Sequence, residues 1–206
     1  MVTTPTALLL HGAFTDASVW VRVTARLRHH AVPVTAPANP LGGLAADAAY
    51  ISCVASRIAG PVVLVGHAYG GTVISAAGTA PNVVGLVSIA AYALAEGESV
   101  RDLERRFPSP TVAGRLGEMA HPLGTGHHPF AELARAEAAP AAAWRTRPSW
   151  MLLAGADPAS SPEAVRFCAR RAEATLLEIG DAAHAVPLSH PADVAELIRD
   201  AVRATT

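Results

Sequence analysis

The sequence predicts an α/β fold in which a mostly parallel sheet lies between two layers of helices. Short apolar runs alternate along the chain with stretches of helical periodicity, which is typical of this class. The apolar runs are nearly continuous, as in strands that are buried on both faces. The expected strands, about six in number, are residues 6–10, 31–36, 62–65, 83–90, 150–154 and 174–179. A chain of 206 residues suits one core, so we expect a single domain over residues 1–206.

The stretches between these runs carry apolar side chains three or four residues apart, as amphipathic helices do. Such stripes are formed by Val19, Val23 and Leu27, by Ile51, Val54, Ala55 and Ile58, and by Val194, Leu197, Ile198, Ala201 and Val202. Gly60 suits the C′ position of the second of these helices. Ser161 followed by Pro162 predicts an N-cap and the first residue of a further helix.

Residues 95–147 interrupt the alternation. This stretch contains five prolines and one short helical pattern near residues 130–138, and it is too long for a plain connecting loop. We therefore expect a small lid insertion over the sheet.

Composition excludes several classes of partner. The formal net charge is −1 and only 16% of residues are charged, so neither a nucleic acid nor an anionic membrane is expected to bind. The sequence shows no signal peptide and no apolar run of membrane-spanning length, which favours a cytoplasmic protein. His121, His127 and His128 lack a carboxylate or cysteine spaced to complete a metal site, so we expect no metal and no cofactor.

The motif with the most chemical content is the run from residue 62 to residue 71. An apolar strand leads into Gly66-His67-Ala68-Tyr69-Gly70-Gly71. This is the pattern Gly-x-Ser-x-Gly of a nucleophile elbow, with Ala68 where the serine would stand. The tight turn from strand to helix crowds its neighbours, which explains glycine at 66 and 70. The N-terminus of the following helix favours negative charge at the apex.

A second turn supplies candidate donors for an oxyanion. His11-Gly12-Ala13-Phe14 directly follows the first expected strand. The backbone N–H of Ala13, together with that of Tyr69, would form an oxyanion hole, with Phe14 as the alternative donor.

Two further strand ends supply a candidate acid and base. Asp157 follows the fifth expected strand, where a carboxylate can accept a hydrogen bond from a histidine. Glu96, after the fourth strand, is a competing acid. His184 follows the last strand and can reach the apex from there. The chain order 68, 157, 184 is the order of nucleophile, acid and base that favours Asp157 over Glu96.

With these motifs in place, the chain resembles the α/β-hydrolase superfamily, in particular its small esterase-like members related to plant methylesterases and hydroxynitrile lyases. The resemblance rests on His11-Gly12-Ala13, residues 66–71, residues 85–91 followed by Glu96-Gly97-Glu98-Ser99, Asp157, and His184-Ala185-Val186. It implies a Ser–His–Asp hydrolase fold with an oxyanion hole and a variable lid. The strand order should be 2-1-3-4-5-6, which places the site between the first and third strands, where the order reverses.

The substrate pocket should combine residues at strand ends with residues of the lid. Phe14, Tyr69 and Tyr92 follow strand ends, and His121, His128 and Trp144 belong to the insertion. Few charged residues lie near these positions, so we expect a small, neutral, largely apolar substrate that carries an acyl group.

Ala68 admits three interpretations. In the favoured one it is an introduced Ser→Ala substitution in a hydrolase of esters or lactones, because the elbow glycines, acid and base all remain. Such a variant would be inactive or strongly impaired. In the second, Ala68 is native, and His184 oriented by Asp157 acts as a general base in a lyase, an isomerase or cyclase, or a cofactor-free oxygenase. The third interpretation is a ligand-binding protein without catalysis.

Overall fold

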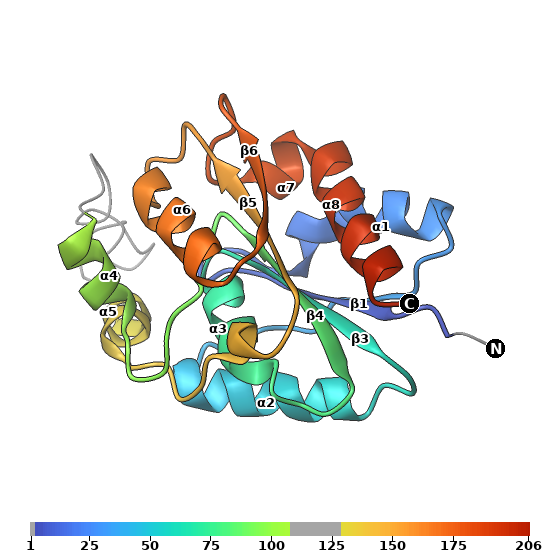
Figure 1. Ribbon diagram of the computed structural model, residues 1–206, viewed down its shortest axis with the longest axis horizontal. Coiled ribbons are helices and arrows are strands. Elements are labelled where there is room, and N and C mark those ends of the chain that lie inside the picture. Colours follow the sequence, from blue (N-terminus) through green and yellow to red (C-terminus); the bar gives the residue numbers. More distant parts are fainter. Residues whose placement is uncertain (1–2, 108–128) are drawn as a thin grey trace.

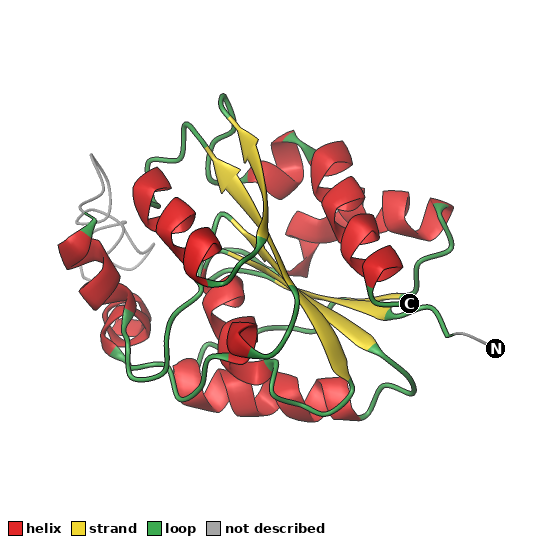
Figure 2. Cartoon of the chain, in the orientation of Figure 1, coloured by secondary structure: helices red, strands yellow, loops and turns green. Residues whose placement is uncertain are grey.

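The computed structural model describes residues 3–107 and 129–206, and within them one six-stranded sheet (Figures 1 and 2). Its strands are β1 (Thr6–Leu10), β2 (Val34–Thr35), β3 (Val62–His67), β4 (Val83–Ile89), β5 (Ser149–Ala154) and β6 (Thr175–Ile179). All neighbouring strands are parallel, in the order β2-β1-β3-β4-β5-β6. The predicted fold class and the predicted strand order are both confirmed.

Helices cover both faces of the sheet (Figure 1). One layer contains α1 (Val21–His29), α7 (Val186–Ser189) and α8 (Pro191–Ala204), and the other contains α2 (Leu44–Ser56), α3 (Tyr69–Ala77) and α6 (Pro162–Arg171). Strand β1 shows how a continuous apolar run serves both layers. Leu8 and Leu10 pack in the core beneath α2 and α3, whereas Ala7 and Leu9 pack in the core beneath α1 and α8. All four side chains are fully buried.

Two local expectations were wrong. The strand expected over residues 31–36 is only Val34–Thr35, because Ala31 adopts a φ of 56° and the N–H of Val32 donates to the carbonyl of Leu27. The residues after α1 therefore close the helix instead of joining the sheet. Gly60 is not the C′ residue of α2, because that helix is capped at Arg57. Gly60 lies in the turn before β3, with a φ of 89°.

The described residues of the insertion form the short helices α4 (Val100–Arg106) and α5 (Pro129–Ala136) and a 3₁₀ turn over Ala143–Arg145. Its two ends are joined by backbone hydrogen bonds, from Gly97 N–H to the Ala139 carbonyl and from Ala139 N–H to the Glu98 carbonyl, both 2.9 Å. Helix α5 corresponds to the expected helical pattern. Helix α4 was not expected, although Ser99 and Asp102 form a capping box at its start.

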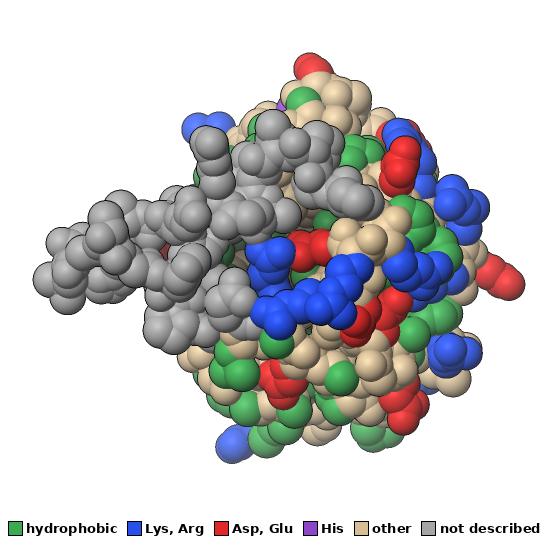
Figure 3. All heavy atoms as spheres, turned by 90° about the vertical axis from the view of Figure 1, so that its left-hand side faces the viewer, with side chains coloured by type: hydrophobic (Ala, Val, Ile, Leu, Met, Phe, Trp, Pro, Cys, Tyr) green, Lys and Arg blue, Asp and Glu red, His purple; other side chains and the backbone are tan. Residues whose placement is uncertain are grey.

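The base of the insertion is held against α6 by charged side chains. The Glu98 carboxylate is 2.6 Å from the Arg171 guanidinium and 3.8 Å from that of Arg106. Both guanidinium groups stack on the Phe167 ring, at 5.0 and 4.6 Å. Figure 3 shows this face of the molecule, on which basic and acidic side chains lie next to one another. The insertion therefore has a fixed attachment to the sheet domain.

Candidate active site

Ala68 lies at the apex of a strained turn between β3 and α3. Its φ of 51° and ψ of −123° form a combination that glycine adopts easily and residues with a Cβ rarely adopt. The glycines around it are required by close packing. A Cβ on Gly66 would lie 2.3 Å from the Gly70 carbonyl oxygen, and one on Gly70 would lie 2.5 Å from that of Leu10. The turn has the backbone form of a nucleophile elbow, with a methyl group in place of the hydroxyl.

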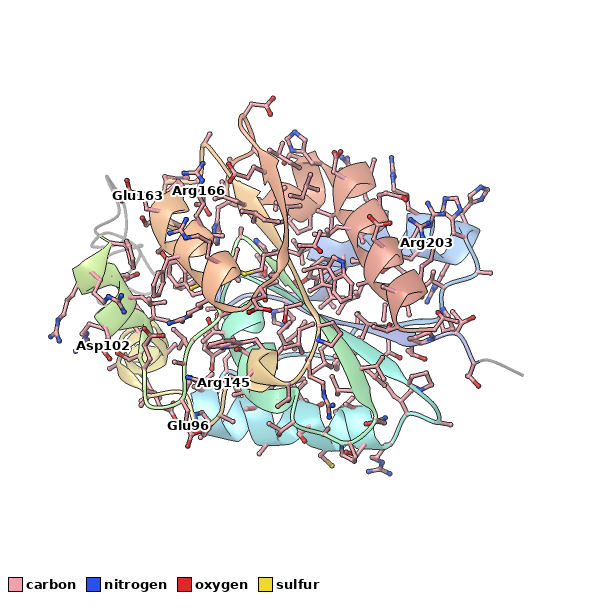
Figure 4. All side chains as sticks on the ribbon, in the orientation of Figure 1. Glu96, Asp102, Arg145, Glu163, Arg166 and Arg203 are labelled. Atoms are coloured by element: carbon pink, nitrogen blue, oxygen red, sulfur yellow. The ribbon has the colours of Figure 1, made fainter. Side chains whose placement is uncertain are left out.

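Asp157 and His184 form a hydrogen-bonded pair, with 2.8 Å between Oδ2 and Nδ1. The Asp157 side chain is 2% exposed, and its other oxygen accepts the N–H of Ala159 at 2.7 Å. A carboxylate only accepts hydrogen bonds, so Nδ1 of the neutral His184 ring carries the proton and Nε2 keeps a lone pair. This is the arrangement of a general base with its orienting acid. Glu96, the competing acid, is exposed on the surface (Figure 4).

A cavity of about 240 Å³ lies at the carboxyl ends of the strands and brings Ala68 and His184 together. Ala13, Phe14, Tyr69 and Tyr92, all expected at the site, lie in its wall. The insertion adds residues of α4 and α5 to this wall: Val100, Glu104, Ala134 and Arg135. The wall of the cavity is therefore formed partly by the sheet domain and partly by the insertion.

Trp144 was expected to line the pocket, and it is not among the described residues of the cavity wall. Its indole N–H donates to the Leu94 carbonyl at 2.7 Å, and its ring stacks against the Arg171 guanidinium at 5.4 Å. These contacts hold Trp144 at the base of the insertion. His121 and His128, the other two residues expected from the insertion, lie outside the described residues.

Sequence reasoning missed several polar residues of the cavity. Glu104 on α4 and Arg135 on α5 form an ion pair, 2.5 Å between Oε2 and Nη2, and Thr15, Thr72 and Ser160 also line the wall. The capping box before α4 was the signal that could have located Glu104 on a helix. The other four residues carry no motif, and only the fold brings them to the cavity.

His67, directly before Ala68, supports the loop that carries the base. Its Nε2 lies 2.8 Å from the His184 carbonyl oxygen and therefore donates to it. Burial lowers the pKa of His67 to about 4, so the ring is neutral at neutral pH. The two imidazole rings lie 5.0 Å apart. The elbow and the base are thus linked by a direct contact.

His11 has a comparable role beneath the expected oxyanion donor. Its Nε2 accepts the N–H of Asn39 at 2.9 Å, so its Nδ1 carries the proton and donates to the Gly12 carbonyl at 2.8 Å. The side-chain amide of Asn39 also donates to the His11 carbonyl, at 3.2 Å. These bonds fix the turn from which Ala13 faces the cavity.

Comparison with known proteins agrees with this geometry. The model of the alpha/beta hydrolase family matches residues 7–197, so the chain belongs to the α/β-hydrolase family. No curated protein matches the chain. Within residues 3–107 and 129–206, no cluster of three or more His, Cys, Asp or Glu side chains could hold a metal ion, and no helix is long and apolar enough to cross a membrane.

Several solved structures share the fold. A pyrethroid hydrolase from Sphingobium faniae JZ-2 is 20% identical, with a TM-score of 0.73 and 98% of each chain covered. Polyneuridine aldehyde esterase is 18% identical, with a TM-score of 0.72, over 95% of this chain and 98% of that one. A thermophilic esterase from Thermogutta terrifontis is 20% identical, with a TM-score of 0.66, over 99% and 91%. The structural neighbours therefore include esterases and hydrolases.

Proposed function

We propose that the cavity is the site of an esterase-type acyl transfer from esters or lactones, in which Ala68 occupies the position of the nucleophile. The chain as it stands then lacks the covalent step and hydrolyses its substrate poorly. The observation that carries this proposal is the His184–Asp157 pair, which shares one cavity with the strained turn at Ala68. A strained turn and a buried carboxylate are both costly, and nucleophile activation requires both.

Each part of the site has a role in that reaction when position 68 carries a hydroxyl. His184 Nε2 accepts the hydroxyl proton as the oxygen attacks the substrate carbonyl, and Asp157 stabilises the imidazolium. The N–H groups of Ala13 and Tyr69 stabilise the oxyanion. His184 then returns the proton to the leaving alkoxide, and the acyl group stays bonded to the oxygen at position 68. A water molecule, deprotonated by the same nitrogen, attacks this ester, and His184 gives the proton back to that oxygen as the acid leaves.

The neighbouring structures and the cavity support the substrate class. The neighbours include an esterase and a hydrolase by name. The cavity wall is mainly apolar, and its Glu104–Arg135 pair has no net charge. We therefore propose a small, neutral, largely apolar acyl compound as the substrate.

The direct test is Ala68→Ser, assayed on short and aromatic p-nitrophenyl esters and on lactones. We expect kcat/KM to rise by at least about 100-fold over the unaltered chain, since losing the nucleophile removes most turnover in such triads. Ala134→Ser places a hydroxyl elsewhere on the same cavity wall and should bring no such gain. The gain should disappear again in Ala68→Ser/His184→Ala. The proposal is wrong if the serine variant hydrolyses nothing faster than the unaltered chain.

The intact base favours a second candidate for the unaltered chain. His184 can remove a proton from an activated C–H without a covalent intermediate, as in a lyase, an isomerase or cyclase, or a cofactor-free oxygenase. The test is deuterium exchange from D₂O into β-keto esters, followed by NMR, with His184→Ala as the control. Exchange that depends on His184 supports this candidate. Ligand binding that survives His184→Ala, with no reaction in either assay, would identify a binding protein instead.

A further inference from the structure

The first turn of α2 receives a carboxylate from the insertion. The N-cap of this helix is Gly43, with a φ of 117°, and no side chain of the cap residue pairs with the turn. Glu137, just after α5, takes that role and accepts the N–H of Leu44 at 2.5 Å and that of Ala45 at 3.0 Å. A Cβ on Gly43 would lie 3.0 Å from the nearer Glu137 oxygen, so glycine permits this approach. The carboxylate also faces the positive end of the helix dipole.

The same turn contains a fully buried carboxylate that the proposed reaction does not use. Asp47 is 0% exposed. Its Oδ1 accepts the N–H of Gly42 at 2.9 Å, and its Oδ2 accepts the hydroxyl proton of Tyr69 at 2.7 Å. Burying a carboxylate is costly unless strong hydrogen bonds satisfy it. The hydrogen-bond partners of Asp47 therefore indicate its role, and one of these partners is the Tyr69 hydroxyl.

Tyr69 connects this turn to the reaction centre. It follows Ala68 directly, opens α3 and lines the cavity. Burial, with the Asp47 contact adding to it, raises the pKa of Tyr69 well above its usual range, so the phenol stays protonated and donates. A ring held at its hydroxyl end and at its backbone has little freedom to move. The backbone N–H that we assign to the oxyanion hole is held with it.

We propose that the first turn of α2 is a positioning element of the active site, in which Asp47 fixes Tyr69 and Glu137 docks helix α5 on the same turn. Ala134 and Arg135, which α5 contributes to the cavity wall, lie three and two residues before Glu137. The first turn of α2 thus holds both the α5 part of the cavity wall, through Glu137, and Tyr69, the residue next to position 68. The kinetic consequences rest on the proposed function, whereas the docking does not.

The kinetic test uses the Ala68→Ser background with Tyr69→Phe, Asp47→Asn and the double variant. We expect kcat to fall about tenfold with KM within about twofold, because the bond acts on the oxyanion donor and not on general affinity. The double variant should lose no more than the larger single loss, since both changes break one bond. Unchanged kcat, or losses that multiply, would overturn the role of Asp47. Tyr69→Phe keeps the ring and guards against a trivial folding defect.

The second test needs no activity and uses amide hydrogen exchange on the chain with Ala68 in place. Glu137→Ala should accelerate exchange at Leu44 and Ala45 and over residues 133–138 at least about tenfold, and Glu137→Gln, which keeps one acceptor, should fall between. Asp47→Asn should likewise accelerate amide exchange at Gly42, whose N–H donates to the Asp47 carboxylate. Residues 62–67 in β3 serve as the internal reference, and Glu163→Gln, an exposed glutamate on α6, as the matched control (Figure 4).

The outcomes separate the two proposals. Exchange that is unchanged in the Glu137 variants refutes the docking, whatever the kinetics show. Accelerated exchange in a chain whose Ala68→Ser variant hydrolyses no ester leaves the docking of α5 on α2 in place and refutes the proposed function.

Discussion

Replacing Ala68 with glycine should stabilise the protein, although it removes a side chain. Ala68 has a φ of 51° and a ψ of −123°, and its methyl group is only partly buried. A residue with a Cβ held in such a conformation costs about 1–3 kcal/mol, and glycine adopts it without that cost. Glycine in turn loses about 0.5–1 kcal/mol more conformational entropy on folding than alanine. The balance favours Ala68→Gly by roughly 1 kcal/mol.

Thermal unfolding followed by circular dichroism measures this difference. For a chain of this size, about 1 kcal/mol corresponds to a rise in Tm of ~2–4 °C. The matched control is Ala49→Gly, the same change at an exposed position in the middle of α2, where it should lower Tm. If Ala68→Gly lowers Tm as Ala49→Gly does, the turn is not strained and the argument from its dihedral angles fails.

Three further outcomes follow from the site. Burial depresses the pKa of His67 from 6.5 to about 4, so the unfolded chain takes up a proton below pH 6.5 that the folded chain refuses. The free energy of unfolding, measured with urea, should therefore fall by ~2 kcal/mol between pH 7 and pH 5, and His67→Gln should flatten this dependence while the exposed His29→Gln should not. In the Ala68→Ser background, Asp157→Asn should lower kcat for p-nitrophenyl esters by about 10³–10⁴-fold with little change in Tm, and an unaffected kcat would remove Asp157 from the mechanism. Gly66→Ala places a Cβ 2.3 Å from the Gly70 carbonyl oxygen and should give little soluble folded protein, as judged by expression and gel filtration.

Most of the sheet could be predicted because the buried strands carry their signal locally. The runs at β1, β3, β4 and β5 are apolar on both faces, so length and composition alone identify them. The edge strand β2 is the exception. The positive φ of Ala31 shortens this strand, and an alanine in the sequence does not indicate such a backbone conformation.

The candidate site likewise contains residues whose positions could be predicted from the sequence and residues whose positions could not. Asp157 and His184 follow strand ends, and parallel strands bring those ends to one edge, so their meeting could be anticipated. Trp144 could not be placed, because its position depends on contacts with Leu94 and Arg171, far from it in the chain. Glu137 shows the same limit, since its partner is a helix N-terminus more than 90 residues away. Such a partner is defined by backbone groups that every residue carries.

Ala68 separates two properties that a serine at this position would combine. The backbone strain belongs to the turn, whereas the nucleophile belongs to the hydroxyl, and this chain keeps the first without the second. Strain with no use would be removed by glycine at a gain in stability, and a buried Asp157 with no use would be replaced by an apolar residue. Both remain, which supports the proposed reaction at Ala68 and His184. Because Ala68→Ser and the unaltered chain would use the same base for different chemistry, His184→Ala should abolish either reaction, and it separates catalysis of both kinds from ligand binding alone.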